Sequence, residues 1–178
     1  MSRVGKKKIE LPKDIEIKIT NSKINIKGKY GNLTLNYLPL VKLTIQDNCL
    51  FVTTKLETRK AKSYHGLIRV LIQNSINGVF NNYTKILCLE GIGFKFLKDD
   101  DLLIVYVGFT HSYNLLIPKT LIVELSSPTK IQISGPSKEE VNTFTDIIRK
   151  IKLPEPYKGK GVLYEGEQIF KKIGKTRR

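Results

Sequence analysis

The residues best suited to chemistry lie in the stretch from Leu153 to Tyr164, LPEPYKGKGVLY. Its two prolines stop an incoming helix, because proline lacks a backbone N–H and restricts the residue before it. Lysine then supplies compact charges for phosphate oxygens, glycine lets the backbone approach another surface, and Tyr157 offers a flat ring. These residue types favour binding to an extended polyanion. A solvated, flexible loop is the alternative.

Basic residues flank this stretch on both sides. Arg149, Lys150 and Lys152 precede it, and five more basic residues follow it towards the C-terminus. Cations also interact favourably with the C-terminal end of a helix dipole, which would explain Lys150 alone but not the whole set. We predict that nucleic acid is bound by the following residues: Arg149, Lys150, Lys152, Tyr157, Lys158, Gly159, Lys160, Gly161, Lys171, Lys172, Lys175, Arg177 and Arg178, with Arg3, Lys6 and Lys7 near the N-terminus.

The charge of the chain is one-sided. Its 178 residues carry a net charge of +15, and residues 149–178 hold ten basic side chains against three acidic ones. Such a balance favours a nucleic acid as partner. A basic protein on an anionic membrane is the competing class, but it would need an amphipathic helix with lysines opposite large apolar residues. The second expected helix instead carries Glu139, Glu140 and Asp146 away from its apolar face, so we expect no membrane contact.

Other arrangements of reactive residues lack the required spacing. Gly91-Ile92-Gly93 has no third glycine, and Gly174-Lys175-Thr176 lacks the upstream glycine of a P-loop. Asp99–Asp101 is typical of a solvated turn. The histidines and cysteines, His65, His111, Cys49 and Cys88, have no zinc-site spacing, and the two thiols are predicted to be buried in a reducing compartment. We therefore expect no enzyme activity, no metal and no cofactor.

The elements that must position these residues follow from periodicity. In the first half, alternating apolar and polar residues predict strands at 15–19, 24–27, 33–37, 41–45 and 50–54. Apolar residues then recur at helical spacing from Ala61, and Asn77-Gly78 is predicted to end that helix. In the second half, strands are predicted at 87–89, 93–98, 102–107, 113–117, 121–125 and 130–134, followed by a helix through Ile151.

The two halves resemble each other at a period near 80 residues. Ile24-x-Ile26-x-Gly28 before Pro39 corresponds to Leu103-x-Val105 and Gly108 before Pro118. The fold class we predict is α+β, with two repeated subdomains at 9–82 and 83–152. Each would be an antiparallel β-sheet covered on one face by one α-helix. Residues 1–8 would form a basic arm, extended and ordered only against a partner, and 153–178 a binding loop and basic tail.

Short motifs spread over the whole chain resemble those of bacterial-type large-subunit ribosomal protein six. The motif with the most characteristic wording is Pro154-Glu155-Pro156-Tyr157-Lys158-Gly159-Lys160-Gly161-Val162. Further motifs in family order are Met1–Lys7, Ile26-Lys27-Gly28 with Gly31, His65-Gly66-Leu67 with Arg69, Asn77-Gly78-Val79, Gly91–Lys95 and Gly108–His111. Any one of these is weak, whereas the collinear set is specific.

The resemblance implies a structural ribosomal protein that binds large-subunit rRNA near the stalk base, beside the elongation-factor site and neighbouring ribosomal proteins. Tyr157 would stack on an unpaired base or ribose, or pack beneath the turn. Ala61 is the only alanine and lysine greatly outnumbers arginine, which indicates A+T-rich coding DNA. With the resemblance, this favours a plastid ribosome, the mitochondrial matrix and the bacterial cytoplasm being alternatives. A free-standing RNA-binding or RNA-remodelling module is the other function left open.

Overall fold

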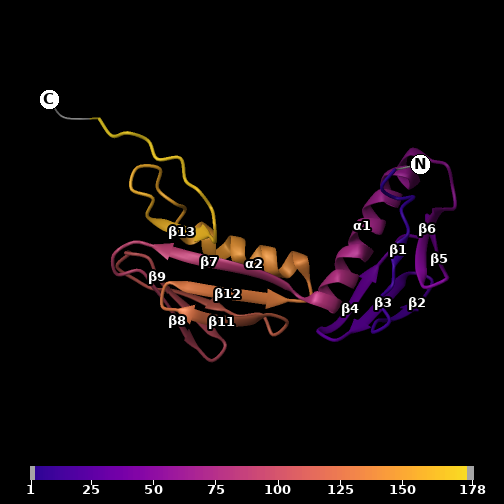
Figure 1. The fold of residues 1–178 in the computed structure, drawn as a ribbon, viewed down its shortest axis with the longest axis horizontal. Helices are drawn as coiled ribbons and strands as arrows, with labels where there is room; N and C mark the ends of the chain where they lie inside the picture. Colours follow the sequence, from indigo (N-terminus) through magenta and orange to yellow (C-terminus); the bar gives the residue numbers. More distant parts are fainter. Residues whose placement is uncertain (1–2, 176–178) are drawn as a thin grey trace. The chain divides into compact units, whose positions relative to one another are not determined.

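In the computed structural model, which describes residues 3–175, the chain divides into two compact units (Figure 1). The first contains the residues up to Tyr83 together with Pro136–Lys138. The second contains Thr84–Gly135 and the residues from Glu139 onward. Each unit is built from short β-strands and one helix, which is the α+β class predicted from the sequence.

The first unit consists of two three-stranded sheets and one helix. Its sheets have the strand orders β2-β3-β4 and β1-β6-β5, and every neighbouring pair is antiparallel. The elements are β1 (Ile9–Glu10), β2 (Glu16–Ile19), β3 (Lys23–Gly28), β4 (Gly31–Asn36), β5 (Val41–Gln46), β6 (Cys49–Thr54) and α1 (Arg59–Asn81). The sequence predicted one sheet here. Its short-range periodicity found β2 to β6, but it did not reveal β1 or the division into two sheets.

The core of the first unit forms where α1 meets strands from both sheets. Ile24 and Ile26 alternate inward along β3, while Ile68, Ile72 and Ile76 repeat every four residues along α1, and all five are buried. The helix contacts β3 and β4 of one sheet and β5 and β6 of the other. One apolar stripe on a helix therefore closes both sheets.

The first helix runs four residues beyond the predicted stop at Asn77-Gly78. It ends at Asn81, and the backbone N–H of Asn82 donates to the carbonyl oxygen of Gly78. A Cβ at Gly78 would lie only 1.9 Å from the carbonyl oxygen of Pro136. Gly78 is therefore required for a close approach inside the helix and not for a C-terminal cap, which is why the prediction was wrong.

The second unit repeats this arrangement and adds one strand. Its sheets have the orders β10-β9-β8 and β11-β12-β7-β13. The elements are β7 (Tyr83–Glu90), β8 (Lys95–Asp99), β9 (Leu102–Tyr106), β10 (Tyr113–Leu116), β11 (Ile122–Ser127), β12 (Lys130–Gly135), α2 (Lys138–Ile151) and β13 (Gly161–Tyr164). The helix α2 runs alongside β7 and β12 of the four-stranded sheet (Figure 1) and buries Val141, Phe144 and Ile148 on one face.

The predicted duplication is confirmed element by element. A three-stranded meander, a hairpin and a helix follow one another in both units, as β2 to β6 with α1 and as β8 to β12 with α2. The two helices begin at Arg59 and Lys138, an offset of 79 residues. β1 beside β6 corresponds to β7 beside β12, so β13 is the strand without a counterpart. The lysine-rich stretch and this extra strand therefore extend the repeat.

Candidate nucleic-acid interface

Residues 153–160, which we call the lysine loop, form a closed turn after α2. The backbone N–H of Glu155 donates to the carbonyl oxygen of Lys160 at 2.9 Å, and the N–H of Gly159 donates to the carbonyl oxygen of Glu155 at 2.9 Å. These two bonds close the turn around Pro156, Tyr157 and Lys158. The loop is therefore held by its own backbone, and the side chains at its tip need not contribute to the turn.

Gly159 and Gly161 are required by the fold of this loop. Gly159 has φ +76°, a left-handed conformation that side chains disfavour, and it is buried. A Cβ at Gly161 would lie 2.7 Å from Cα of Pro154. The sequence predicted that these glycines would bring the backbone close to RNA. In the structure their close approaches are internal, and the Gly159 N–H is already bonded.

Two further backbone contacts fix the loop to the rest of the unit. β13 follows it and pairs antiparallel with β7, placing Gly161 opposite Glu90, and the N–H of Val162 donates to the carbonyl oxygen of Lys152 at 2.9 Å. The described tail, residues 165–175, folds back so that the N–H of Lys172 donates to the carbonyl oxygen of Pro156 at 2.8 Å. The lysine loop and the tail consequently present their side chains together.

The side chains at the loop and tail are exposed cations. Lys158 is exposed and Lys160 is half-buried, and three lysines of the tail are exposed: Lys171, Lys172 and Lys175. Within residues 3–175, none of these five ammonium groups is engaged in an ion pair. Tyr157 is 55% exposed, which leaves much of its ring accessible. The result is a concentrated positive surface with one aromatic side chain at its tip.

Arg149, one of the predicted RNA contacts, fixes the start of the tail in the structure. Its Nη2 lies 2.5 Å from Oε1 of Glu167, and its guanidinium lies over the ring of Tyr164 at 4.9 Å from the centroid. The other carboxylate oxygen of Glu167 accepts a hydrogen bond from the N–H of Tyr164. The Arg149 charge is thus satisfied inside the unit, where it joins α2 to the turn after β13.

Lys152 also has an internal partner set. Its ammonium donates to the carbonyl oxygen of Val107 at 3.0 Å and lies 5.1 and 4.8 Å from the ring centroids of Phe94 and Phe109. One exposed cation remains at the end of α2, Lys150, and it is paired with Asp146 at 2.7 Å. This hydrogen bond and the charge of Asp146 raise the pKa of Lys150. Each of the three basic residues at the end of α2 therefore has a partner inside the unit, and the charges of Arg149 and Lys150 are balanced by carboxylates.

The basic residues near the N-terminus belong to the first unit. Arg3, Lys6 and Lys7 are exposed. The arm was predicted to be extended, but in the structure it forms a turn, in which the N–H of Lys7 donates to the carbonyl oxygen of Val4. The Arg69 guanidinium donates to the carbonyl oxygen of Lys7. Gly5 is buried, and a Cβ there would lie 2.4 Å from Nδ1 of His65.

Two of the predicted binding residues, Arg177 and Arg178, lie outside the described residues.

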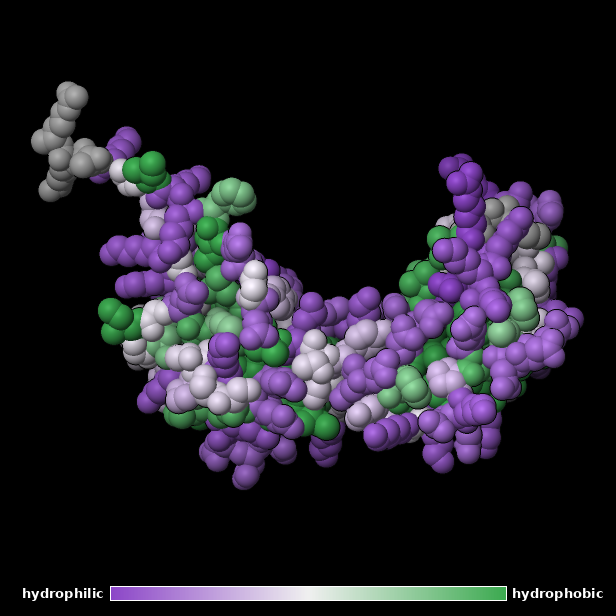
Figure 2. Space-filling view, viewed as in Figure 1, coloured by the Kyte–Doolittle hydropathy of each residue, from purple (hydrophilic) through white to green (hydrophobic). Residues whose placement is uncertain are grey.

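Sequence reasoning did not single out two apolar side chains of the tail. Phe170 and Ile173 are each 96% exposed, although they are large and apolar. Figure 2 shows hydrophobic residues among hydrophilic ones along this tail. The available signal was the order Phe-Lys-Lys-Ile, in which two cations stand between an aromatic and an aliphatic side chain. Exposed rings beside lysines are typical of surfaces on which nucleic-acid bases stack.

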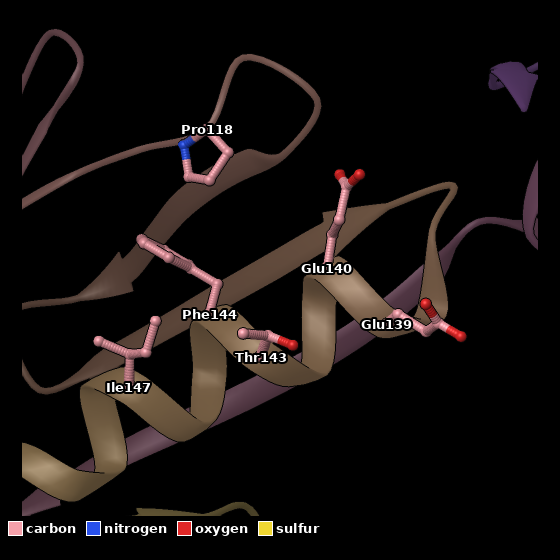
Figure 3. Close-up of a pocket in the computed structure, with 6 residues that line it drawn as sticks. All are labelled: Pro118, Glu139, Glu140, Thr143, Phe144 and Ile147. Carbon is pink, nitrogen blue, oxygen red and sulfur yellow. The ribbon is translucent and has the colours of Figure 1, made fainter.

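A hollow beside α2 is bordered by acidic side chains, unlike the lysine loop and tail (Figure 3). Its floor is apolar, with the ring of Phe144 directed towards Pro118 and Ile147 one turn further along the helix. Glu139 and Glu140 border it, and Oε2 of Glu140 accepts a hydrogen bond from the hydroxyl of Thr120. Carboxylates at the rim repel phosphate, so this hollow is not part of the basic surface.

No group of three or more His, Cys, Asp or Glu side chains within residues 3–175 is placed to hold a metal ion. In that same range, neither α1 nor α2 is sufficiently long and apolar to span a membrane. Cys49 and Cys88 are free thiols. They were predicted to be buried, but both are partly exposed.

Comparisons with known proteins match nearly the whole chain. The family model described as Ribosomal protein L6 matches residues 11–81 and 91–165, one stretch in each unit. The "Large ribosomal subunit protein uL6c" of Phaeodactylum tricornutum is 39% identical over 176 residues, covering 99% of both chains. "Large ribosomal subunit protein uL6" of Chloroherpeton thalassium is 40% identical over 99% of this chain and 98% of its own, and that of Halalkalibacterium halodurans is 35% identical over 99% of both. These names denote ribosomal components and not enzymes.

Proposed function

Because the chain belongs to the ribosomal protein L6 family and is therefore a structural constituent of the large ribosomal subunit, we propose that its lysine loop and tail bind large-subunit rRNA. The binding is structural, and the protein catalyses no reaction. Its role is to brace folded RNA and so support translation.

The observation that carries this proposal is the pairing of the lysine loop with the tail. The hydrogen bond from Lys172 to Pro156 joins the tail, which carries three of the five lysines, to the lysine loop, which carries the other two. None of the five has an acidic partner within the described residues. Lysine contacts to phosphates position a protein on RNA, while a rigid, backbone-closed loop recognises the shape of the folded strand. Tyr157, exposed at the tip, stacks on an unpaired base or a ribose in this proposal.

We further propose that this RNA lies near the stalk base, beside the elongation-factor site and neighbouring ribosomal proteins. The family resemblance of the Pro154–Val162 motif supports this position. Arg3, Lys6 and Lys7, which belong to the first unit, would also contact phosphates. The A+T-type composition, with one alanine, and the similarity to the uL6c protein of Phaeodactylum support a plastid ribosome.

Sedimentation tests this function. Tagged protein in a cell or organelle lysate is expected to migrate with the large subunit at moderate salt and to remain there after a high-salt wash. A free-standing RNA-binding module would exchange and be washed off. Protein found at the top of the gradient under both conditions would contradict residence in the subunit. The organelle of origin is decided by separating plastids, mitochondria and bacteria before lysis.

A further inference from the structure

The motif Gly108–His111 has no role in the function proposed so far, and its side chains form an aromatic cluster at the surface. Phe109, His111 and Tyr113 contact one another, with ring centroids 5.0 to 6.2 Å apart. The rings of Phe109 and His111 are almost parallel, at 16°. We propose that these three residues, here called the aromatic platform, bind an unpaired nucleotide of rRNA by stacking on its base.

The exposure of the platform argues that it is not part of the core. Phe109 is 45% exposed, and His111 is exposed as well. Tyr113 is half-buried and is held in β10, opposite Val105 of β9. The apolar core of this unit lies elsewhere, in residues such as Phe96 and Leu103, which are fully buried. The platform therefore leaves aromatic surface exposed next to the start of β10.

Backbone geometry holds the platform in place. Gly108 begins the loop with φ +76°, and a Cβ there would lie 2.9 Å from Cε1 of Phe94. This close approach lets the chain turn over the buried ring of Phe94 before Phe109 emerges. A loop fixed in this way loses little further freedom when a ligand binds, which favours affinity.

Lys152 connects the platform to the lysine loop. Its ammonium lies over the ring of Phe109, and its own carbonyl oxygen accepts the hydrogen bond from Val162 that fixes the loop's far end. The aromatic faces and the lysines consequently lie on adjoining parts of one unit. Aromatic rings next to cations are the combination used for single-stranded RNA, because bases stack on the rings while phosphates contact the cations.

An unpaired base fits this surface better than a protein segment does. The platform offers flat rings with cations nearby, and Lys152 adds positive charge beneath one of them. Stacking is open to any base with an exposed face, but a base within a duplex is covered by its neighbours. The proposal rests on rRNA binding by the protein and adds a second contact that depends on stacking, not on charge.

The absence of tryptophan from the chain provides a direct probe. Phe109→Trp places a single tryptophan in the platform. Leu116→Trp places one outside the platform, at a 76% exposed position of β10, the strand that holds Tyr113. Deproteinised large-subunit rRNA is expected to quench the tryptophan at 109 and leave the one at 116 unchanged. Phe109→Ala and His111→Ala are expected to weaken binding of that rRNA about fivefold or more, with an unaltered salt slope, whereas Leu116→Ala retains wild-type affinity.

The outcomes separate this proposal from the function on which it rests. If wild-type protein binds rRNA but the tryptophan at 109 is not quenched and both alanine variants bind normally, the platform does not bind RNA. Quenching by ribosomal proteins of the large subunit, and not by rRNA, would assign the platform to a protein contact and overturn the proposal. Wild-type protein that fails to bind rRNA would refute the proposed function itself. If the Phe109→Ala variant is unfolded, His111→Ala is the deciding variant. Among the described residues no lysine lies over the His111 ring, so this substitution leaves the contacts of Lys152 in place.

Discussion

Removing the two lysines of the lysine loop should change how binding depends on salt. In the double variant Lys158→Ala/Lys160→Ala the turn itself is preserved, because its hydrogen bonds run between backbone atoms of Glu155, Gly159 and Lys160. The ammonium groups that are lost have no acidic partner within residues 3–175. The variant therefore removes charge from the surface and leaves the loop folded.

The expected magnitude follows from counterion release. Each phosphate neutralised contributes about 0.7 to 0.9 to the slope of log affinity against log salt. The five lysines of the loop and tail would contribute a slope of about −3.5 to −4.5, and loss of two would flatten it by about 1.4 to 1.8. Over a fourfold rise in salt, wild-type protein should then lose about tenfold more affinity than the double variant.

Filter binding of deproteinised large-subunit rRNA at several salt concentrations measures this slope. Lys150→Ala is the matched control, since Lys150 lies at the end of α2 and its charge is already paired with Asp146 at 2.7 Å. We expect the control to keep the wild-type slope and affinity. A double variant with unchanged affinity and slope, or a control that flattens the slope equally, would refute the role of the lysine loop.

Three further predictions concern stability and reactivity. Lys152→Ala should reduce the free energy of unfolding by about 1–3 kcal/mol, measured in urea, because two cation–π contacts and a hydrogen bond are lost; unchanged stability would contradict its structural role. Gly161→Ala should lower the free energy of unfolding by at least about 2 kcal/mol, since its Cβ would meet the Pro154 backbone. Gly159→Ala should lower it by about 1–2 kcal/mol, because the alanine would be strained at a positive φ. Burial raises the pKa of Cys88, so less of its thiol is ionised at pH 8. In a variant whose other cysteine is replaced by serine, alkylation of Cys88 should therefore need a higher pH than alkylation of free cysteine.

Much of the fold could be predicted because its strands and helices have local signals. Alternation along residues such as Ile24 and Ile26 identifies a strand, and the four-residue repeat of Ile68, Ile72 and Ile76 identifies a helix. The parts that were missed depend on distant contacts. β13 is a four-residue strand that begins with Gly161. It forms by pairing with the free edge of β7, some seventy residues earlier in the chain.

For the candidate binding surface, the sequence shows which side chains are charged, but it does not show which of them have partners inside the folded chain. The partners of Arg149 and Lys152 are Glu167 and Val107, 18 and 45 residues away. No local pattern reports such pairs. The exposed lysines at 158, 171 and 172 stay as predicted contacts, because their ammonium groups have no ion-pair partner within residues 3–175.

The central claim is that the lysine loop faces large-subunit rRNA, and directed hydroxyl-radical cleavage tests it most directly. Iron tethered through Tyr157→Cys, in protein without its two natural cysteines, is incorporated into large subunits, and the cut sites in the rRNA are mapped. Leu116→Cys provides the comparison position. We predict strong cleavage at the stalk base from position 157 and weaker, different cleavage from position 116. Subunits that contain the tethered protein but show no rRNA cleavage from position 157 would contradict the account.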